Sequence, residues 1–372
     1  MRYYLIAGER SGDLHASNLI KSLKKEDDKA EFRFLGGEMM QSAGGEMYRH
    51  YKDISLMGFW EVLSNLATIS KNLKSCKADL IEYNPDVLIL VDFSGFNLRV
   101  AAAAKKAGIK VYYYISPKIW AWNQSRAHKI KRLVDKMFVI IPFEKEFYKK
   151  FDFEVDYVGN PVFDAIHEFV PNPSFKADNQ LDEREIIAVL PGSRQQEVVQ
   201  MLHYMVNVVP VFRKYQFVVA AVSNLSEEYY EMFNRDKDLK IIYEQPYDIL
   251  ANAKAAIVTS GTATLETALF GVPQVVCYKT SGFTYLIVKA LIKVKFISLV
   301  NLIVDKQVVK ELIQDDFIPR NLVDELSKIT EKPDFIKTQK EGYAELQALI
   351  GGVGASDTTA KLIVKYLKES DN

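Results

Sequence analysis

The sequence predicts an α/β protein of two Rossmann-like domains, each a parallel sheet covered by helices. Its 372 residues are too many for one ordinary domain and suit two of about 150 to 200 residues. Short apolar, β-rich runs alternate with helical segments, which is the pattern of parallel strands joined by crossover helices. The alternation stops once, over residues 168–185, where proline, asparagine and charged residues replace apolar ones. The chain therefore divides into two consecutive halves.

Ten apolar runs are the predicted strands. Five lie in the first half, at residues 3–7, 32–35, 87–91, 110–115 and 137–141, and five in the second, at 186–190, 217–221, 240–243, 256–259 and 274–278. We therefore expect an N-terminal domain over 1–167, a linker over 168–185 and a C-terminal domain over 186–350. Within the last stretch, 351–372, residues 359–369 have the spacing of an amphipathic helix, which we expect to return to the first domain.

Composition excludes several classes of function. Lysine plus arginine and aspartate plus glutamate both number 48, so the net charge is zero and no global field recruits nucleic acid. Cys76 and Cys277 give neither a disulfide framework nor a metal-binding spacing. The first apolar run is too short for a secretory signal. The longest apolar stretch, 281–304, is interrupted by three lysines and does not span a membrane, although it could lie on one. We expect a cytoplasmic protein without a metal or other cofactor.

The first predicted strand leads into the loop AGERSGD. In doubly wound folds ligands bind beyond the carboxyl ends of the strands, so this loop is a candidate site. Gly8 and Gly12 allow the backbone to approach a ligand. Ser11 and Asp13 lie where the next helix begins, and they either contact that ligand or cap the helix.

Asp92 follows the third predicted strand, in VDFSGFN. A carboxylate at the tip of a buried strand can have a raised pKa and accept a proton from a substrate. The alternative is a helix-capping aspartate. A glycine and Asn97 in the same loop favour the functional interpretation.

A basic helix follows the fourth predicted strand and two tryptophans, in WAWNQSRAHKIKR. Arg126 and Lys129 are candidates to bind the phosphate of a single anionic head group. The alternative is a solvated helix face.

The loop LPGSR in the second half runs from a strand into a helix. Ser193 and Arg194 there would bring backbone N–H groups and a guanidinium to a phosphate. It lacks the lysine and the spacing of a P-loop.

The segment SGTATLE begins another helix of the second half. Ser260, Gly261 and Thr262 form a helix start of small residues, which suits a pyrophosphate. Glu266 lies one turn further, where a carboxylate can hold a ribose diol. Plain capping is the alternative for either loop alone, and the presence of both at strand ends of one domain favours a nucleotide site.

The loops carry motifs of a known family. AGERSGD, GGEMMQSAG, MGFWEVL, NPDVLILVDFSGFN, YYISPKIWAWNQSR, IPFEKEFY, VGNP, LPGSR, SGTATLE and NLIVDKQVVKELIQ occur in the order seen in lipid-A-disaccharide synthases. The resemblance runs from the first strand past Gln314. It implies a glycosyltransferase of the B fold (GT-B), in which two Rossmann-like domains face a cleft.

Members of that family join UDP-2,3-diacylglucosamine to 2,3-diacylglucosamine 1-phosphate, giving the β-1,6-linked lipid A disaccharide 1-phosphate and UDP. The resemblance implies this reaction here, without a metal, by a protein peripheral to the cytoplasmic face of the bacterial inner membrane. It also implies a homodimer formed through the second domain.

The resemblance also implies roles for the acidic residues of the first half. An α-linked donor that gives a β product requires inversion, so a base should deprotonate the acceptor hydroxyl. The family pattern D-x-P-D-F-N has a second acid where this chain has Gly95, which leaves Asp92 as the candidate base. Glu9 either takes that role or positions the acceptor, with Ser11 beside it. The family's W-A-W-R has Asn123 in place of the arginine, which weakens a phosphate contact.

In the second half, Arg194, the turn at residues 260–262 and Asn301 would stabilise the departing UDP, and Glu266 would hold its ribose. The usual V-G-H-P reads V-G-N-P here, with Asn160 in place of the histidine.

The acyl chains need an apolar surface, and the segment LMGFWEVLSNLATISKNL offers one. Its apolar residues exceed what one buried helix face requires. They are Met57, Phe59, Trp60, Leu63, Leu66 and Ile69. The alternative is an ordinary amphipathic helix that faces the core.

Two other functions fit the same pattern of loops. One is a UDP-N-acetylglucosamine 2-epimerase, which needs no lipid-facing helix. The other is a UDP-sugar-binding protein without catalysis, which would tolerate the loss of Asp92.

Overall fold

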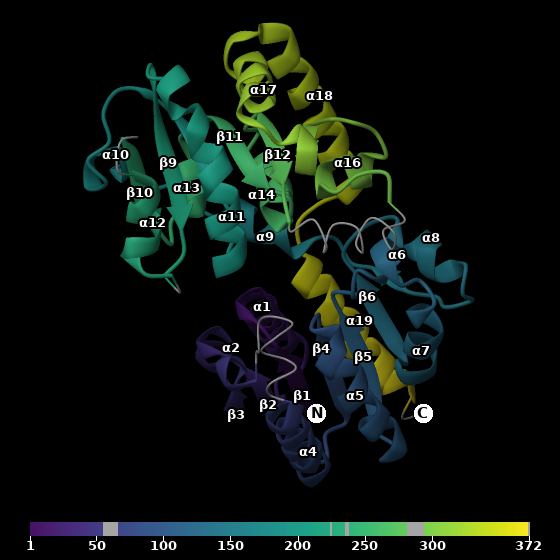
Figure 1. The fold of residues 1–372 in the computed structure, drawn as a ribbon. Helices are drawn as coiled ribbons and strands as arrows, with labels where there is room; N and C mark the ends of the chain where they lie inside the picture. Colours follow the sequence, from purple (N-terminus) through teal and green to yellow (C-terminus); the bar gives the residue numbers. More distant parts are fainter. Residues whose placement is uncertain (55–65, 224, 235–237, 281–293, 371–372) are drawn as a thin grey trace. The chain divides into compact units, whose positions relative to one another are not determined.

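The computed structural model describes residues 1–54, 66–223, 225–234, 238–280 and 294–370. The chain forms two compact units (Figure 1). Unit 1 comprises Met1–Pro161 and Gly352–Asn372, and unit 2 comprises Val162–Gly351. Each unit contains one wholly parallel sheet, which confirms the predicted α/β class with two Rossmann-like domains.

The sheet of unit 1 has seven strands in the order β3-β2-β1-β4-β5-β6-β7. The strands are β1 (Arg2–Ala7), β2 (Glu31–Gly36), β3 (Glu46–His50), β4 (Val87–Val91), β5 (Lys110–Tyr114), β6 (Lys136–Val139) and β7 (Asp156–Tyr157). Every residue of β4 is buried, as expected of a central parallel strand. The sequence does not predict β3 and β7, because these edge strands are rich in polar residues and largely half-exposed.

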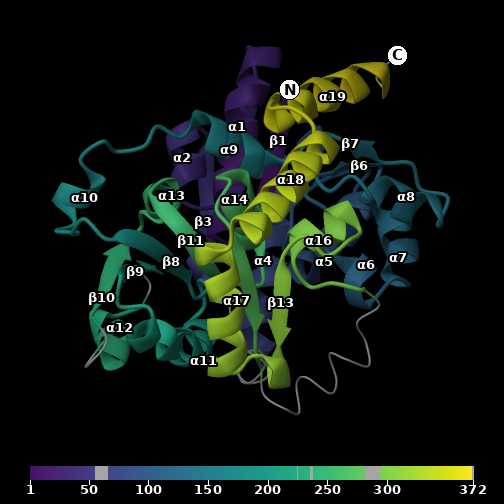
Figure 2. The ribbon, with the colours of Figure 1, turned by 90° about the horizontal axis from the view of Figure 1, so that it is seen from above.

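The helices of unit 1 include one from the C-terminal end of the chain. They are α1 (Arg10–Glu26), α2 (Glu38–Ala43), α4 (Leu66–Tyr83), α5 (Ser94–Lys106), α6 (Ile119–Trp122), α7 (Arg126–Leu133), α8 (Glu144–Lys149) and α19 (Ala355–Ser370). Figure 2 shows α19 beside α1. On α19, Asp357 accepts hydrogen bonds from Ser22 Oγ at 2.6 Å and Lys25 Nζ at 3.1 Å, and Ile363 is buried in the same apolar cluster as Leu19. The predicted return of the C-terminal helix to the first domain is confirmed.

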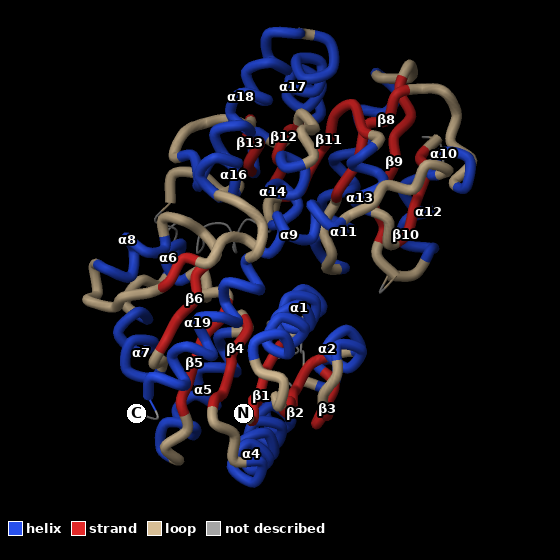
Figure 3. Tube along the Cα trace, turned by 180° about the vertical axis from the view of Figure 1, so that it is seen from behind, coloured by secondary structure: helices blue, strands red, loops and turns tan. Residues whose placement is uncertain are grey.

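The sheet of unit 2 has six strands in the order β10-β9-β8-β11-β12-β13 (Figure 3). The strands are β8 (Glu185–Leu190), β9 (Tyr215–Ala221), β10 (Leu239–Tyr243), β11 (Ala253–Thr259), β12 (Gln274–Tyr278) and β13 (Lys310–Ile313). The helices are α9 (Pro161–Glu168), α10 (Phe175–Asp178), α11 (Gln195–Met205), α12 (Glu227–Asn234), α13 (Pro246–Ala251), α14 (Thr262–Leu269), α16 (Leu299–Val304), α17 (Pro319–Glu331) and α18 (Pro333–Ile350). The sequence predicts all of these strands except β13.

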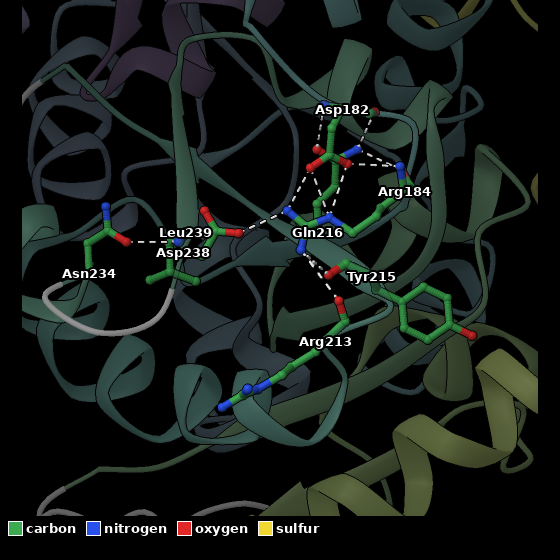
Figure 4. Close-up of polar contacts among 8 residues, drawn as sticks. All are labelled: Asp182, Arg184, Arg213, Tyr215, Gln216, Asn234, Asp238 and Leu239. Atoms are coloured by element: carbon green, nitrogen blue, oxygen red, sulfur yellow. Dashed lines mark hydrogen bonds and ion pairs between the residues drawn. The ribbon is translucent and has the colours of Figure 1, made fainter.

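Residues 168–185, which the sequence analysis assigns to a linker, belong to unit 2. They contain α10, and Phe175 is buried in the core of that unit. Figure 4 shows Arg184 donating to Asp182 and Asp238 and to two backbone carbonyls at the start of β9. These bonds join the amino ends of neighbouring strands, at the end of the sheet opposite the carboxyl ends of its strands.

No helix in the described part of the chain has both the length and the hydropathy needed to span a membrane.

Candidate functional site

Unit 1 has its topological switch point between β1 and β4, where the strand order reverses. Ala7 at the end of β1 is paired with Val91 at the end of β4. The loops that follow these two strands therefore lie side by side, at the position where doubly wound folds bind ligands. The structure thus brings the loop that begins at Gly8 next to the loop that begins at Asp92.

Close packing explains the first glycine of this loop. A Cβ atom on Gly8 would lie 2.1 Å from Cγ of Phe93, so only glycine leaves room for the phenyl ring. A Cβ atom on Gly12 would make an ordinary contact with Cβ of Ala7 at 3.4 Å, so packing does not require glycine there. Gly8 lets the β4 loop approach β1 closely, which accounts for it without a ligand.

The acidic residues of this loop have different surroundings. Ser11 is exposed, and its Oγ donates to Oε1 of the half-buried Glu9 at 3.2 Å. Asp13 is fully buried and accepts three backbone N–H bonds of 2.7 to 3.2 Å around the start of α2. Asp13 therefore caps α2 and not its own helix, whereas Glu9 and Ser11 remain accessible to a substrate.

Asp92 is half-buried and directly follows β4. Its backbone carbonyl accepts hydrogen bonds from Nδ2 of Asn97 at 2.8 Å and from the hydroxyl of Tyr113. Both partners are fully buried. Asn97 is thus a structural partner of the loop, and Tyr113 is a residue that the sequence analysis does not single out.

Two helices that follow β5 carry the aromatic and basic residues. The guanidinium carbon of Arg126 lies 4.8 Å from the centre of the Trp122 ring, which is 42% exposed. Burial raises the pKa of Tyr113 well above its ordinary value, the Asp92 carboxylate adds to this and the Arg126 guanidinium opposes it. Asp92 and Arg126 therefore both act on the buried Tyr113 hydroxyl, whereas Lys129 is exposed on α7.

Glu144 is a buried acid that the sequence analysis missed. It is 1% exposed, and its carboxylate accepts hydrogen bonds from Trp120 Nε1 at 3.1 Å and from the backbone N–H of Ile141 at 3.1 Å. Burial raises its pKa from 4.5 to about 7, and the hydrogen bonds oppose that rise. Glu144 holds α6 through Trp120 and so supports the segment that presents Trp122.

Unit 2 has its switch point between β8 and β11, which are paired through Leu190 and Val258. The loops after these strands lead into α11 and α14, so two helices begin side by side at the carboxyl ends of the central strands. Their first backbone N–H groups have no partner within the helix and carry partial positive charge. This arrangement suits a diphosphate.

The first of these loops presents an arginine. Gly192 has φ of +111°, a conformation that favours glycine. Arg194 directly precedes α11 and its side chain is 58% exposed, with Nη1 3.7 Å from Oε1 of Glu197. An ion pair of this length at the surface is weak, so the guanidinium can turn to a phosphate. Ser193 is exposed beside it.

In the second loop the exposed polar groups belong mainly to the backbone and not to side chains. The hydroxyl of Ser260 donates to the carbonyl of Ile297 at 2.8 Å. A Cβ atom on Gly261 would meet no atom within 4 Å, and Thr262 is exposed at the first position of α14. Ser260 thus fixes the loop, and the space over Gly261 is open.

Glu266 lies on α14 and accepts a hydrogen bond from the hydroxyl of Tyr247 at 3.0 Å. Burial raises the pKa of Glu266, and the bond from Tyr247 opposes that rise. The Tyr247 ring packs against Phe169 and Phe270, with ring centres 5.5 and 5.4 Å away. The sequence motif points to the acid but not to the tyrosine that orients it.

Asn301 has a structural role that differs from the expected contact with UDP. Its side chain is fully buried, donates to the Val309 carbonyl and to Glu311, and accepts from the N–H groups of Val308 and Val309, all at 2.7 to 2.9 Å. The two donated bonds use both N–H groups of the amide, and the two accepted bonds use its oxygen. Asn301 therefore shapes the turn before β13 and leaves no donor for a leaving group.

The expected acyl-binding residues fall mostly outside the described part of the chain. Met57, Phe59, Trp60 and Leu63 lie there, and for Leu66 only its place at the start of α4 is described. Ile69 is half-buried on α4. The lipid-facing segment stays a prediction.

Among the residues that the structure describes, no three His, Cys, Asp or Glu side chains gather closely enough to hold a metal ion.

Two parallel-sheet domains, each with its loops gathered at a topological switch point, define a protein of the GT-B fold class. A UDP-GlcNAc 2-epimerase from Neisseria meningitidis has a similar structure, with a TM-score of 0.67, 13% sequence identity and coverage of 99% of this chain and 100% of that one. The glycosyltransferase of kitacinnamycin gives a TM-score of 0.63 at 13% identity, covering 98% of each chain. At such low identity these likenesses establish the fold alone.

Sequence comparison identifies the family within that class. The model of the lipid-A-disaccharide synthetase family matches residues 3–361. The lipid-A-disaccharide synthase of Trichlorobacter lovleyi is 35% identical over 99% of this chain and 98% of its own length. That of Syntrophus aciditrophicus is 36% identical, with the same coverage. The chain belongs to the lipid-A-disaccharide synthetase family, as the motifs in its loops predict.

Proposed function

We propose that the protein is a metal-independent glycosyltransferase that joins UDP-2,3-diacylglucosamine to 2,3-diacylglucosamine 1-phosphate. The products are the β-1,6-linked lipid A disaccharide 1-phosphate and UDP. The observation that carries this proposal is the match to the family over residues 3–361, together with a chemically suitable loop cluster in each unit.

Unit 2 is proposed to bind the UDP part of the donor. The starts of α11 and α14 supply backbone N–H groups to the diphosphate, and the exposed guanidinium of Arg194 adds a full positive charge. Glu266, oriented by Tyr247, accepts hydrogen bonds from the ribose hydroxyls. As the bond to the sugar breaks, these donors stabilise the negative charge that develops on UDP.

Unit 1 is proposed to bind the acceptor and to supply the base. The Asp92 carboxylate takes the proton of the acceptor 6-hydroxyl while that oxygen attacks the anomeric carbon from the face opposite UDP. Glu9, with Ser11 bonded to it, positions the sugar. Arg126 and Lys129 at the start of α7 meet the 1-phosphate, with Trp122 holding the Arg126 guanidinium in place.

The lipid substrates imply that the protein works at a membrane surface. We propose peripheral association with the cytoplasmic face of the inner membrane through the apolar residues between 57 and 69, because their number exceeds what one core-facing helix stripe needs. The homodimer through the second domain stays a prediction.

The test is incubation of the purified protein with both lipids in detergent micelles, followed by mass spectrometry of the lipid fraction and quantification of UDP. The proposal expects one disaccharide 1-phosphate for each UDP released and no product when either lipid is left out. A parallel incubation with UDP-N-acetylglucosamine tests the epimerase alternative. Conversion of that nucleotide sugar without disaccharide formation would refute the proposed function.

A further inference from the structure

The backbone at the end of β4 has an uncommon conformation. Asp92 and Phe93 both have φ of +43°, in the left-handed region. Aspartate adopts this region occasionally, but a bulky aromatic residue does so only when its surroundings enforce it. Two such residues in succession turn the chain sharply between the strand and α5. The turn therefore stores strain that other contacts must offset.

Two buried side chains from different elements form hydrogen bonds to the same backbone oxygen of this turn. The backbone carbonyl oxygen of Asp92 accepts hydrogen bonds from the hydroxyl of Tyr113 on β5 and from Nδ2 of Asn97 on α5, the latter at 2.8 Å. Nδ2 of Asn97 also lies 3.3 Å from the carbonyl oxygen of Val91. We refer to Tyr113 and Asn97 as the carbonyl clamp.

The ring of Phe93 also helps to hold the turn. It lies directly over Gly8, where a Cβ atom would come within 2.1 Å of Cγ of the ring, and it stacks on Phe96 with ring centres 5.6 Å apart. The backbone N–H of Asp92 meanwhile donates to the carbonyl of Tyr114 at 3.3 Å and extends the pairing of β4 with β5 by one residue. These contacts fix the backbone of the turn, and with it the direction of the Cα–Cβ bond of Asp92.

We propose that Tyr113 and Asn97 are positioning residues for the transfer reaction, which hold Asp92 in the strained turn so that its carboxylate faces the acceptor hydroxyl. This inference rests on the proposed function. Relaxation of Asp92 to an ordinary negative φ would swing its Cα–Cβ bond away from the present direction, because φ sets where the side chain leaves the backbone. A base must be within hydrogen-bond reach of the proton it removes. Displacement by about 1 Å lowers turnover by about a hundredfold.

The test compares Tyr113→Phe and Asn97→Ala with the matched control Tyr3→Phe. Tyr3 is also fully buried in the sheet of unit 1, but its hydroxyl donates to Asp27, at the opposite end of the strands. Each clamp variant should lower kcat about 10- to 100-fold, leave both KM values within about threefold and leave UDP affinity unchanged. The control should keep the kcat of the wild type.

A double variant and an exchange measurement keep the inference separate from simple destabilisation. Because both side chains act on one oxygen, the loss in the double variant should be smaller than the product of the single losses. Hydrogen exchange followed by mass spectrometry should show faster exchange over residues 92–97 in the clamp variants and unchanged exchange in α1. If one clamp variant does not fold, the other carries the test.

Folded clamp variants with the kcat of the wild type would overturn the inference and leave the proposed function standing. A wild-type protein without disaccharide synthesis would refute the proposed function. In that case the exchange measurement decides the structural part: unchanged exchange over residues 92–97 would show that the clamp does not hold the turn.

Discussion

Replacing the buried Glu144 by glutamine is expected to flatten the pH dependence of the stability of unit 1. In the folded protein burial raises the pKa of this carboxyl from 4.5 to about 7, whereas in the unfolded chain it returns to its ordinary value. Well below pH 4.5 the group is protonated in both states, so its titration does not change the free energy of unfolding. Between pH 4.5 and 7 the folded state keeps a proton that the unfolded state releases, so the free energy of unfolding falls as the pH rises.

The size of the effect follows from that change in pKa. At about 1.4 kcal/mol for each pKa unit, the rise from 4.5 to about 7 corresponds to about 3 kcal/mol, reached in full above pH 7. Glutamine has nearly the same shape and does not titrate. It keeps one acceptor oxygen for Trp120 or Ile141 and loses the other bond, which changes the absolute stability but not its slope with pH. The difference between wild type and variant should therefore shift by about 3 kcal/mol from pH 4.5 to pH 8.

The assay is urea unfolding followed by tryptophan fluorescence. All three tryptophans of the chain, Trp60, Trp120 and Trp122, belong to unit 1, so the signal reports that unit. Glu146→Gln is the matched control, because this residue lies on the same helix with an exposed side chain, and it should keep the wild-type pH dependence. Parallel curves for wild type and Glu144→Gln would refute the reasoning.

Three further variants test the proposed site. Asp92→Asn should lower kcat by about two to four orders of magnitude, the usual contribution of a general base, while calorimetry shows unchanged UDP affinity; turnover at the wild-type rate would remove Asp92 from the mechanism. Arg194→Ala should weaken UDP binding by about 1.5 to 3 kcal/mol, the range for a hydrogen bond to a charged group, and equal affinity in the calorimeter would place the diphosphate elsewhere. Serine at Trp60, Leu63 and Leu66 together should reduce co-sedimentation with anionic vesicles and raise KM for the acylated acceptor. A triple variant that keeps both properties, or that unfolds, would assign the segment to the core.

Sequence patterns predicted the strands that are apolar along their whole length. β4 and β8 are examples, because burial on both faces of a parallel sheet leaves a continuous apolar run. The unpredicted strands are held by their partners and not by their own composition. β13 pairs with β12 through residues from Lys310 to Ile313. Its polar residue Glu311 accepts hydrogen bonds from the backbone N–H groups of Ile297 and Ser298. Such a strand has no period that a single sequence shows.

The sequence predicts those candidate site residues that directly follow a strand. It does not reveal residues from other strands and helices that contact them only in the folded chain. Asp92 and Arg194 can be read from the ends of apolar runs. The chain has twenty tyrosines, and nothing in the sequence distinguishes Tyr113 and Tyr247 from the others. Only the folded chain shows that their hydroxyls bond to the Asp92 carbonyl and to the Glu266 carboxylate. Asn301 is the converse case: a polar residue that stands out in a motif forms its hydrogen bonds to the turn that carries it.

The contacts around the two switch points indicate different chemical tasks. In unit 2 the side chains of Ser260 and Asn301 bond to backbone carbonyls or N–H groups of neighbouring loops, so they fix the main chain. The backbone N–H groups at the helix starts are then the groups proposed to bind an anion. In unit 1 the arrangement is reversed: Tyr113 and Asn97 fix the main chain so that a side chain, Asp92, is presented. A diphosphate is recognised by several distributed N–H donors, each contributing a part, whereas proton transfer depends on one correctly placed group. Single substitutions at the loops of unit 2 should therefore act mainly on UDP affinity, and those at the β4 turn of unit 1 mainly on turnover.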